Sequence, residues 1–472
     1  EALLLAAVAT ALFLAGVTEA LSLFHALTRG ALLASWGGLV AVLAAVLAAG
    51  LLWRRPERGP AATFRGWTLA LLLPLQLILL TVAVIAVMAP PNNWDSMAYH
   101  MARVMHWIQN QGIGHYPTHC TRQVFMPPLA EWMILHLQLL SGGDHLANLV
   151  QWGALAGSVL GVSWIAKLLG AKAWGQAGAD AWLAGGARRL GLVRPPETRN
   201  LWLQEAVTRC HQRLGWDVND PATSWNARPY HLSLGWNHED TAASPLHTLL
   251  ALLALPLLAW PRWPEKVRAW GYVAAVAAGV ALFAGALGWQ EWHVRLMLPS
   301  LILAMPAAGL ALEKALTPWG GIPVAALLLL AAVPYVVNNA TRPLFGYDPE
   351  AEPPEPERIL TARSIFRQPR EAQYFSCRPD AYDSFVRVAE SLADSRCARL
   401  GLQMGWNSWE YPLWVLTAAR GGHPRIEHVG VTNETARLAE RPPFRGFVPE
   451  RRLYLYSLPG FRPQTPPRPR PD

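Results

Sequence analysis

The chain has 472 residues, of which 52% are hydrophobic and only 15% are charged, and its formal net charge is +8. Soluble domains carry about 25% charged residues, and the apolar residues here gather in long runs, so the composition excludes an ordinary soluble enzyme and predicts an α-helical polytopic membrane protein. The basic residues stand beside the apolar runs, as membrane topology requires. No basic soluble face is visible, so a nucleic-acid partner is not expected.

Several apolar runs approach or exceed the ~18 to 20 residues that a helix needs to cross a hydrocarbon core. The predicted spans are 2–25, 31–53, 67–88, 146–169, 246–261, 270–288, 294–312 and 321–337. Lys and Arg collect in short cytoplasmic loops, and the loops 54–65 and 261–268 are rich in basic residues. With these two loops inside, Asp95, His238–Asp240 and the chain after Asn338 lie outside.

This topology requires an odd number of crossings between Lys167 and Ser244, and the only candidate segment is 171–199. The segment is rich in Gly and carries charged residues such as Lys172 and Asp180. A charge at a helix centre costs about 2.5 to 3.5 kcal/mol on insertion scales. We therefore expect that one or more membrane helices are missing from this atypical stretch.

The chain is expected to form three parts. An N-terminal membrane hairpin covers 1–66, and a membrane core with an external loop at 89–144 covers 67–337. An external soluble domain covers 338–472 and ends in a disordered tail. In this domain helix-like and strand-like segments alternate, which predicts a small α/β unit. The segments are a helix at 383–393, a strand at 399–403, a helix at 411–420, a strand at 426–429 and a last strand at 452–456.

The chain has four cysteines, and none of them stands in a CxxC or zinc-finger spacing. Cys377 and Cys397 both lie in the domain placed outside. A disulfide between these two cysteines is therefore one expectation in an oxidising compartment. The spacing alone leaves the pairing open.

Three groups of ionisable residues stand beside predicted membrane ends on the external side. They are Asp95 with Tyr99, His100 and Arg103; His238 with Glu239 and Asp240; and His293 with Arg295. Ionisable groups at membrane depth are expensive and tend to be functional. A carboxylate can act as a general base on a hydroxyl or amine, and an Arg can hold a phosphate through paired hydrogen bonds. The segment His238–Asp240 can supply a second base or a site for a divalent metal.

Each group also has a structural interpretation. Asp95 can be a helix N-cap, and the helical spacing after it suits an interfacial helix that lies at the headgroup level. His238–Asp240 can be the solvated end of a loop. Arg295 can be an interfacial anchor whose charged end reaches toward water. The presence of all three groups on one side favours the functional interpretation.

Four motifs, together with the segment 409–414, resemble a bacterial family of membrane glycosyltransferases of the GT-C type, which is related to protein O-mannosyltransferases and to the lipid A aminoarabinose transferase. The resemblance covers most of the chain from about residue 67 onward. The motifs are Trp94-Asp95-Ser96-Met97-Ala98-Tyr99-His100, Arg122-Gln123 with Pro127-Pro128-Leu129-Ala130-Glu131, His238-Glu239-Asp240-Thr241-Ala242, and Trp292-His293-Val294-Arg295-Leu296 with Pro299.

The resemblance implies a GT-C-like fold with a first external loop of interfacial helices and a sugar donor linked to polyprenyl phosphate. It also implies that an acidic residue of that loop is the catalytic base, a position that Asp95 matches, and that the region of Arg295 binds the donor phosphate. Relatives often have two adjacent acidic residues where this chain has Asp95 and Ser96, so the need for a divalent metal stays open. They also have more membrane helices, and the stretch 171–199 falls where those helices would be.

We therefore expect an inverting sugar transfer to a lipid, glycan or protein acceptor on the external, periplasmic face of the bacterial inner membrane. Asp95 would deprotonate the acceptor, and Arg295 would stabilise the departing lipid phosphate with help from Arg103 or Arg122. Glu239 or Asp240 would orient the acceptor or hold a metal. The further substrate-binding candidates are Tyr99, His100, Gln123, His238 and His293.

Two other functions remain as alternatives. A transporter or flippase of lipid-linked sugars would share the basic and aromatic membrane face, but it predicts broken helices in symmetric halves, and no repeat is visible. A non-catalytic assembly protein would fit if missing helices have destroyed the site. The sequence does not identify the sugar, the acceptor or the lipid.

Overall fold

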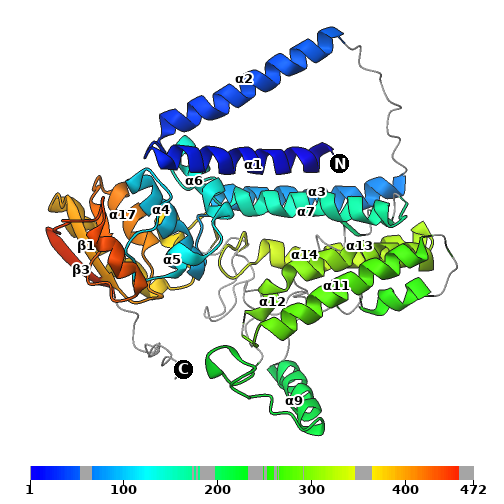
Figure 1. Cartoon of the computed structure of the whole chain (residues 1–472). Helices are drawn as coiled ribbons and strands as arrows, with labels where there is room; N and C mark the ends of the chain where they lie inside the picture. The colour runs from blue at the N-terminus through cyan, green and yellow to red at the C-terminus, as the bar shows by residue number, and fades with distance from the viewer. Residues whose placement is uncertain are drawn as a thin grey trace. The chain divides into compact units, whose positions relative to one another are not determined.

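The computed structural model describes residues 2–53, 66–172, 175–176, 179–180, 197–231, 248, 252–259, 263, 265–290, 292–345 and 364–455. Within these residues the chain is mostly helical, with one small sheet close to the C-terminal end (Figure 1).

Six helices of the described chain are long and apolar enough to cross a membrane. They are α1 (Ala2–Leu23), α2 (Arg29–Trp53), α7 (Leu149–Leu168), α11 (Lys266–Ala286), α13 (Leu298–Ala315) and α14 (Pro318–Val337). Helix α3 (Gly66–Met88) is also apolar, although its segment Leu72–Met88 falls short of that length. These helices agree with the predicted spans and indicate a multi-pass membrane protein. Only part of the predicted span 246–261 is described, and there residues 252–254 are helical and η3 (Leu255–Ala259) is a 3₁₀-helix.

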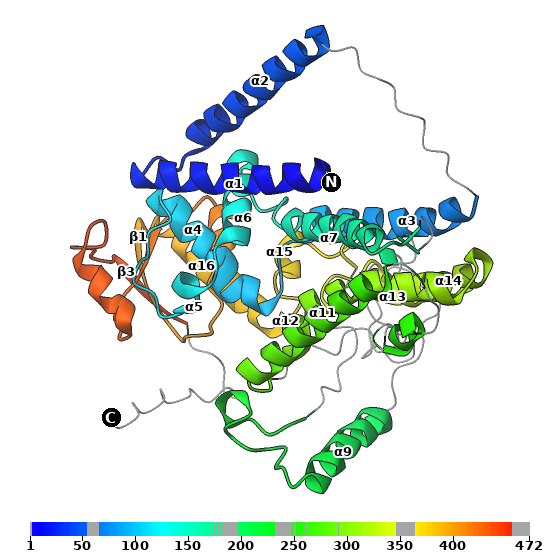
Figure 2. The same ribbon diagram turned by 45° about the vertical axis from the view of Figure 1, so that its right-hand side comes forward.

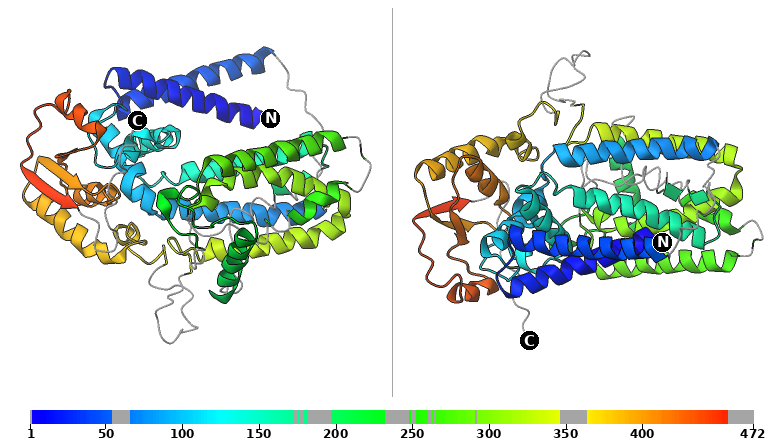
Figure 3. Two further views of the ribbon diagram at one scale, coloured as in Figure 1. Left: turned by 60° about the horizontal axis from the view of Figure 1, so that its bottom comes forward. Right: turned by 90° about the horizontal axis from the view of Figure 1, so that it is seen from above.

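The chain divides into two compact units, each assembled from separate stretches of sequence. The first unit comprises Glu1–Leu5, Arg58–Ile85 and Gln151–Gln368. In it, the Trp152 indole N–H of α7 donates to the Leu79 carbonyl of α3 at 2.9 Å, and the Tyr272 hydroxyl of α11 donates to the Leu303 carbonyl of α13 at 2.7 Å. The green helix α11 accordingly lies along α13 in Figure 3. Apolar helices thus form most of this unit.

The second unit comprises Ala6–Glu57, Ala86–Val150 and Pro369–Asp472. Its sheet has three parallel strands, β1 (Arg399–Met404), β2 (Arg425–His428) and β3 (Arg451–Leu455), in the order β2-β1-β3. The central strand β1 is buried along most of its length, as expected when elements cover both faces of a parallel sheet. A Cβ at Gly401 would lie only 2.9 Å from Pro449, so the close packing at this position requires glycine.

Two helices of the C-terminal domain, α16 (Tyr382–Asp394) and α17 (Tyr411–Ala419), pack against each other, and α16 lies beside the sheet in Figure 2. The alternating strands and helices confirm the predicted α/β unit with boundaries that differ by one or two residues. The parallel pairing follows from the helix α17, which connects β1 to β2 and brings the chain back to the same end of the sheet.

The segment that carries Asp95 consists of short helices. A π-helical turn, η1 (Ser96–His100), continues into α4 (Met101–Asn110), and α5 (Arg122–Phe125) and α6 (Leu129–Ser141) follow. Helix α4 reaches the sheet, because the Gln109 side chain accepts from the Ile426 backbone N–H at 2.8 Å and donates to its carbonyl at 3.0 Å. Helix α6 contacts α1 and α2 through His136, whose ring nitrogens lie 2.8 Å from the Thr18 hydroxyl and 3.0 Å from the Trp36 indole nitrogen.

Two expectations have a different outcome. The disulfide between Cys377 and Cys397 is wrong: both are free thiols, Cys397 within the core around β1 and Cys377 against the separate core around Met97. Most of the stretch 171–199 lies outside the described residues, so the missing-helix hypothesis stays a prediction. Just after it, α9 (Glu197–Arg213) is a polar helix rather than a span.

Candidate functional site

Asp95 and Arg122 meet at the surface of the second unit. An Arg122 Nη1 atom lies 3.4 Å from an Asp95 carboxylate oxygen, and the side chains are 19% and 14% exposed respectively. Asp95 directly precedes the turn η1, whereas Arg122 begins α5. The packing of these short helices therefore brings together the predicted base and one of its predicted partners.

Two aromatic rings flank this ion pair. The Arg122 guanidinium carbon lies 4.6 Å from the centre of the Tyr99 ring and 5.2 Å from that of Trp406, both within cation–π range. The second Arg122 terminal nitrogen donates to the Asn407 side-chain oxygen. The Arg122 guanidinium is thus surrounded by Asp95, Tyr99, Trp406 and Asn407. We call these four residues together with Arg122 the Asp95 cluster.

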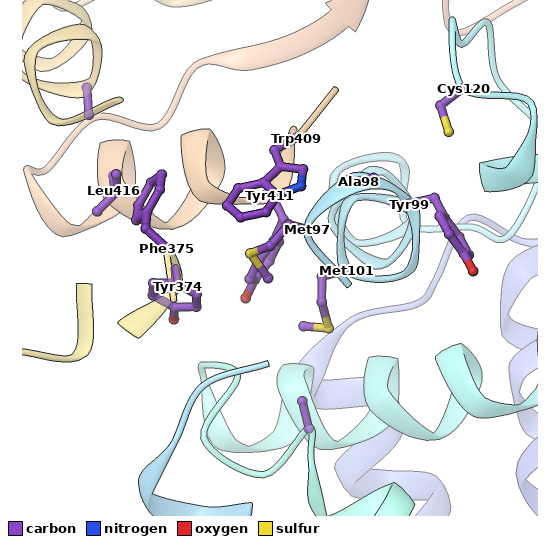
Figure 4. Packing of buried hydrophobic residues seen from close by; sticks show 12 residues of the cluster. Met97, Ala98, Tyr99, Met101, Cys120, Tyr374, Phe375, Trp409, Tyr411 and Leu416 are labelled. Carbon is purple, nitrogen blue, oxygen red and sulfur yellow. The ribbon is translucent and has the colours of Figure 1, made fainter. Parts of the chain in front are cut away.

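The Asp95 cluster lies next to a hydrophobic core that includes residues of η1 and of the C-terminal domain. In Figure 4, Met97 of η1 projects toward Trp409 and Tyr411 of the C-terminal domain, whereas Tyr99 projects from the opposite side of the same turn. The Glu410 backbone N–H also donates to the Met97 carbonyl at 3.0 Å. One side of the turn therefore packs against the C-terminal domain, and Tyr99 on the other side contacts Arg122.

A second carboxylate, Glu131 of α6, lies in the same segment but is only 1% exposed. One of its oxygens is 2.8 Å from His100 Nδ1 and 3.4 Å from Arg103 Nη1. Burial alone would raise the pKa of Glu131, but the hydrogen bond and the attraction to His100 lower it. Arg103 is also buried, and it donates to the Met126 and Val124 carbonyls around the end of α5 at 2.9 and 3.3 Å. This geometry gives Arg103 a structural role in holding α5.

Glu410, at the start of α17, is the centre of a fully buried polar network. One carboxylate oxygen accepts from His106 Nε2 at 2.7 Å and from the Trp414 indole N–H at 3.0 Å. The other accepts from the Gln123 amide at 2.7 Å and from His428 Nε2 at 3.2 Å. The predicted substrate-binding residue Gln123 therefore serves this network.

Two histidines stabilise the charge of Glu410. Burial alone would raise the pKa of Glu410, but the neighbouring His106 and His428 and their hydrogen bonds hold it well below its usual value. Burial also lowers the pKa of His428, whose Nδ1 accepts the His119 backbone N–H at 3.2 Å. His428 is thus a neutral ring whose Nε2–H faces the carboxylate.

The same residues have the spacing of a metal centre. In the described part of the chain, His106, Glu410 and His428 each offer one ligand atom, and these atoms lie within 4.8 Å of one another. However, four N–H donors already occupy the two carboxylate oxygens, which have about four acceptor positions. The Glu410 carboxylate is therefore fully hydrogen-bonded, although the buried His106 Nδ1 has no hydrogen-bond partner among the described residues, and a metal would have to replace several of the donors to Glu410.

Asp144 makes a further buried carboxylate contact between the same two stretches of sequence. Its oxygens accept from Arg370 at 2.8 Å and from the hydroxyls of Tyr374 and Tyr411 at 2.7 and 2.9 Å. Together with the Glu410 network, this contact holds the segment 86–150 firmly on the C-terminal domain.

The other predicted site residues lie elsewhere. His293 and Arg295 are on α12 (His293–Leu296) in the first unit, where the His293 ring contacts Phe283 with the ring centres 5.0 Å apart. His238, Glu239 and Asp240 lie outside the described residues.

Sequence reasoning assigned no role in the site to Trp406, Asn407 or His428. Trp406 and Asn407 lie in the loop that follows the predicted strand 399–403, and ligand-binding loops commonly occupy that position in α/β folds. That signal was present in the sequence. The partner of His428 is 18 residues away along the chain, and no local pattern indicates the contact.

Comparisons with protein-family models, with curated proteins and with solved structures found no match to this chain.

Proposed function

We propose that the protein transfers a sugar from a polyprenyl-phosphate-linked donor to an acceptor at the external face of a bacterial inner membrane. The observation that carries this proposal is the ion pair of Asp95 with Arg122 at a partly exposed surface beside Tyr99 and Trp406. A carboxylate can act as a general base, and aromatic rings with a few convergent charged groups are typical of sites that bind small molecules.

In the proposed reaction, Asp95 accepts the proton of an acceptor hydroxyl or amine while that oxygen or nitrogen attacks the anomeric carbon of the donor sugar. The bond between the anomeric carbon and the phosphate oxygen breaks, and polyprenyl phosphate leaves with the electron pair. Inversion at the anomeric carbon follows from this single displacement. Arg122, which contacts Asp95 within the second unit, would stabilise the leaving phosphate.

Asp95 is a better candidate for the base than Glu131, the carboxylate of α6. A base must come within about 3 Å of the proton it takes. Glu131 is 1% exposed and is engaged by His100 and Arg103. Asp95 retains exposed surface, so an acceptor can approach it.

The test is transfer of labelled sugar from a panel of synthetic polyprenyl-phosphate sugars to endogenous acceptors in membranes that contain the full chain. Asp95→Asn keeps the size of the side chain but removes the base, so we expect turnover to fall by about 10²-fold or more. The matched control is Asp383→Asn, which changes an exposed carboxylate of α16 and should retain activity. Full turnover by Asp95→Asn would overturn the assignment.

A further inference from the structure

The loop that carries Trp406 and Asn407 leaves the carboxyl end of the central strand β1. From β1 the chain continues through α17 to β2 on one side, and β3 pairs on the other side. The connections therefore reverse direction at β1. In open parallel sheets, ligands bind beyond the carboxyl ends of the strands at such a reversal.

Hydrogen bonds hold this loop at both ends. The Gly405 backbone N–H and the Ser408 hydroxyl both donate to the Leu455 carbonyl of β3, at 3.0 and 3.1 Å. At the far end, the Glu410 backbone N–H is bound to Met97. Trp406 and Asn407 thus lie on a fixed support, which lowers the entropy cost of ligand binding.

Trp406 differs from the other tryptophans nearby. Trp409 and Trp414 are 5% and 9% exposed, whereas Trp406 is 36% exposed. Its ring lies beside the guanidinium that also contacts Asp95 and Asn407. A large apolar ring is therefore open to solvent next to a carboxylate, a guanidinium and an amide.

We propose that Trp406 and Asn407 form a saccharide subsite that holds a pyranose ring beside Asp95. The apolar C–H face of a pyranose would stack on the indole. The sugar hydroxyls would hydrogen-bond to the neighbouring carboxylate, guanidinium and amide. The Asn407 oxygen already accepts from Arg122, so the amide NH₂ is the donor end for a sugar hydroxyl. The role of this subsite in sugar transfer rests on the proposed function of Asp95. The binding of a pyranose at Trp406 and Asn407 does not depend on that function.

The subsite can be tested by ¹⁹F NMR of the full chain in detergent micelles with 5-fluorotryptophan in place of tryptophan. The Trp406 resonance is assigned from its absence in Trp406→Phe, and methyl pyranosides of several configurations are the probes. We expect at least one pyranoside to shift the Trp406 resonance and to leave that of Trp216, which is 63% exposed in the other unit, unchanged. If no pyranoside shifts Trp406, or if both resonances shift alike, the subsite does not exist.

Loss of the ring should weaken binding of the active pyranoside by about fivefold or more, which is the lower end of the range for stacking on an aromatic side chain. Affinity can be measured by saturation-transfer NMR on the ligand, with Trp406→Ala against Trp406→Phe and the control Trp216→Ala. Only Trp406→Ala should lose affinity, and equal affinity in all three variants would overturn the subsite.

The two proposals can fail separately. A pyranoside that binds at Trp406 in a chain that transfers no sugar leaves the subsite standing and removes the proposed function. Sugar transfer with the same KM in Trp406→Ala as in the native chain leaves the function standing and removes the subsite.

Discussion

Glu410 shows how a single buried charge can organise a domain. A carboxylate removed from water is costly unless hydrogen bonds replace its hydration. Here the donors come from four places in the sequence: α4, α5, α17 and β2. The charge therefore requires these elements to come together in one arrangement.

Replacement of Glu410 by Gln should destabilise the second unit. The amide keeps one acceptor oxygen, but its NH₂ group would face N–H donors and leave them unpaired. We expect a loss of about 3 kcal/mol, a typical cost for breaking a buried charged contact. Thermal unfolding in detergent, followed by tryptophan fluorescence, would show a lower Tm. The control is Glu440→Gln, which changes an exposed side chain, and equal Tm values for both variants would contradict this role.

Two buried histidines predict that acid destabilises the same unit. Burial lowers the pKa of His136 from 6.5 to about 4 and also lowers that of His428. Because the folded state then binds fewer protons than the unfolded state, stability is complete above about pH 6.5 and falls as the pH drops below it, by up to about 1.4 kcal/mol per pH unit for each histidine. The lowered pKa of Glu410 acts in the same direction below its ordinary value of 4.5.

The measurement is the Tm between pH 7.5 and pH 5, with His428→Gln as the comparison. Glutamine can place an amide N–H toward Glu410 but does not titrate, so the Tm of this variant should depend less steeply on pH. A Tm that rises as the pH falls would contradict the assignment of neutral histidines.

At the scale of elements, the sequence predicted what local pattern determines. The helices and strands of the C-terminal domain were predicted because apolar residues alternate at strand spacing in one segment and at helical spacing in the next. The Asp95 segment was recognised as helical for the same reason. The contacts between these elements could not be predicted, since they depend on side chains about 300 residues apart, such as His106 and Glu410.

This interdependence predicts that the C-terminal domain does not fold alone. In a fragment of residues 364–455, Glu410 would lose His106 and Gln123, and the Arg370 and Tyr374 pair would lose Asp144. We expect poor dispersion in its ¹H–¹⁵N NMR spectrum and weak near-UV circular dichroism. A fusion that restores 86–150 through a flexible linker should improve both signals. A well-dispersed spectrum from the fragment alone would show that these contacts are dispensable.

For the whole molecule, composition predicted the class and most of the long apolar helices. The apolar character of a span is carried by a continuous run of residues, so no tertiary contact is needed to recognise it. The second unit, by contrast, joins the first helices, the Asp95 segment and the C-terminal domain. Such a division is fixed by long-range packing, and the linear order of apolar and polar stretches does not reveal it.

The positive-inside rule makes a definite prediction for the orientation of the whole chain. It places the basic loop before α11 in the cytoplasm and the C-terminal domain outside. Val267, at the start of α11, is 85% exposed, and Asp383 of α16 is also exposed. A cysteine at either position would therefore report its side of the membrane in a background in which Cys210 and Cys377 are replaced by serine.

In intact spheroplasts, a membrane-impermeant maleimide should label Asp383→Cys and spare Val267→Cys, and permeabilisation should make both reactive. The remaining Cys120 and Cys397 are buried, so labelling of the background variant measures their contribution. Labelling of Val267→Cys alone in intact spheroplasts would mean that the orientation is inverted. Asp95 would then lie on the cytoplasmic side if an odd number of spans separates Asp95 from the basic loop before α11. Labelling of both positions would mean that an even number of crossings lies between them, and it would contradict the three predicted spans 270–288, 294–312 and 321–337.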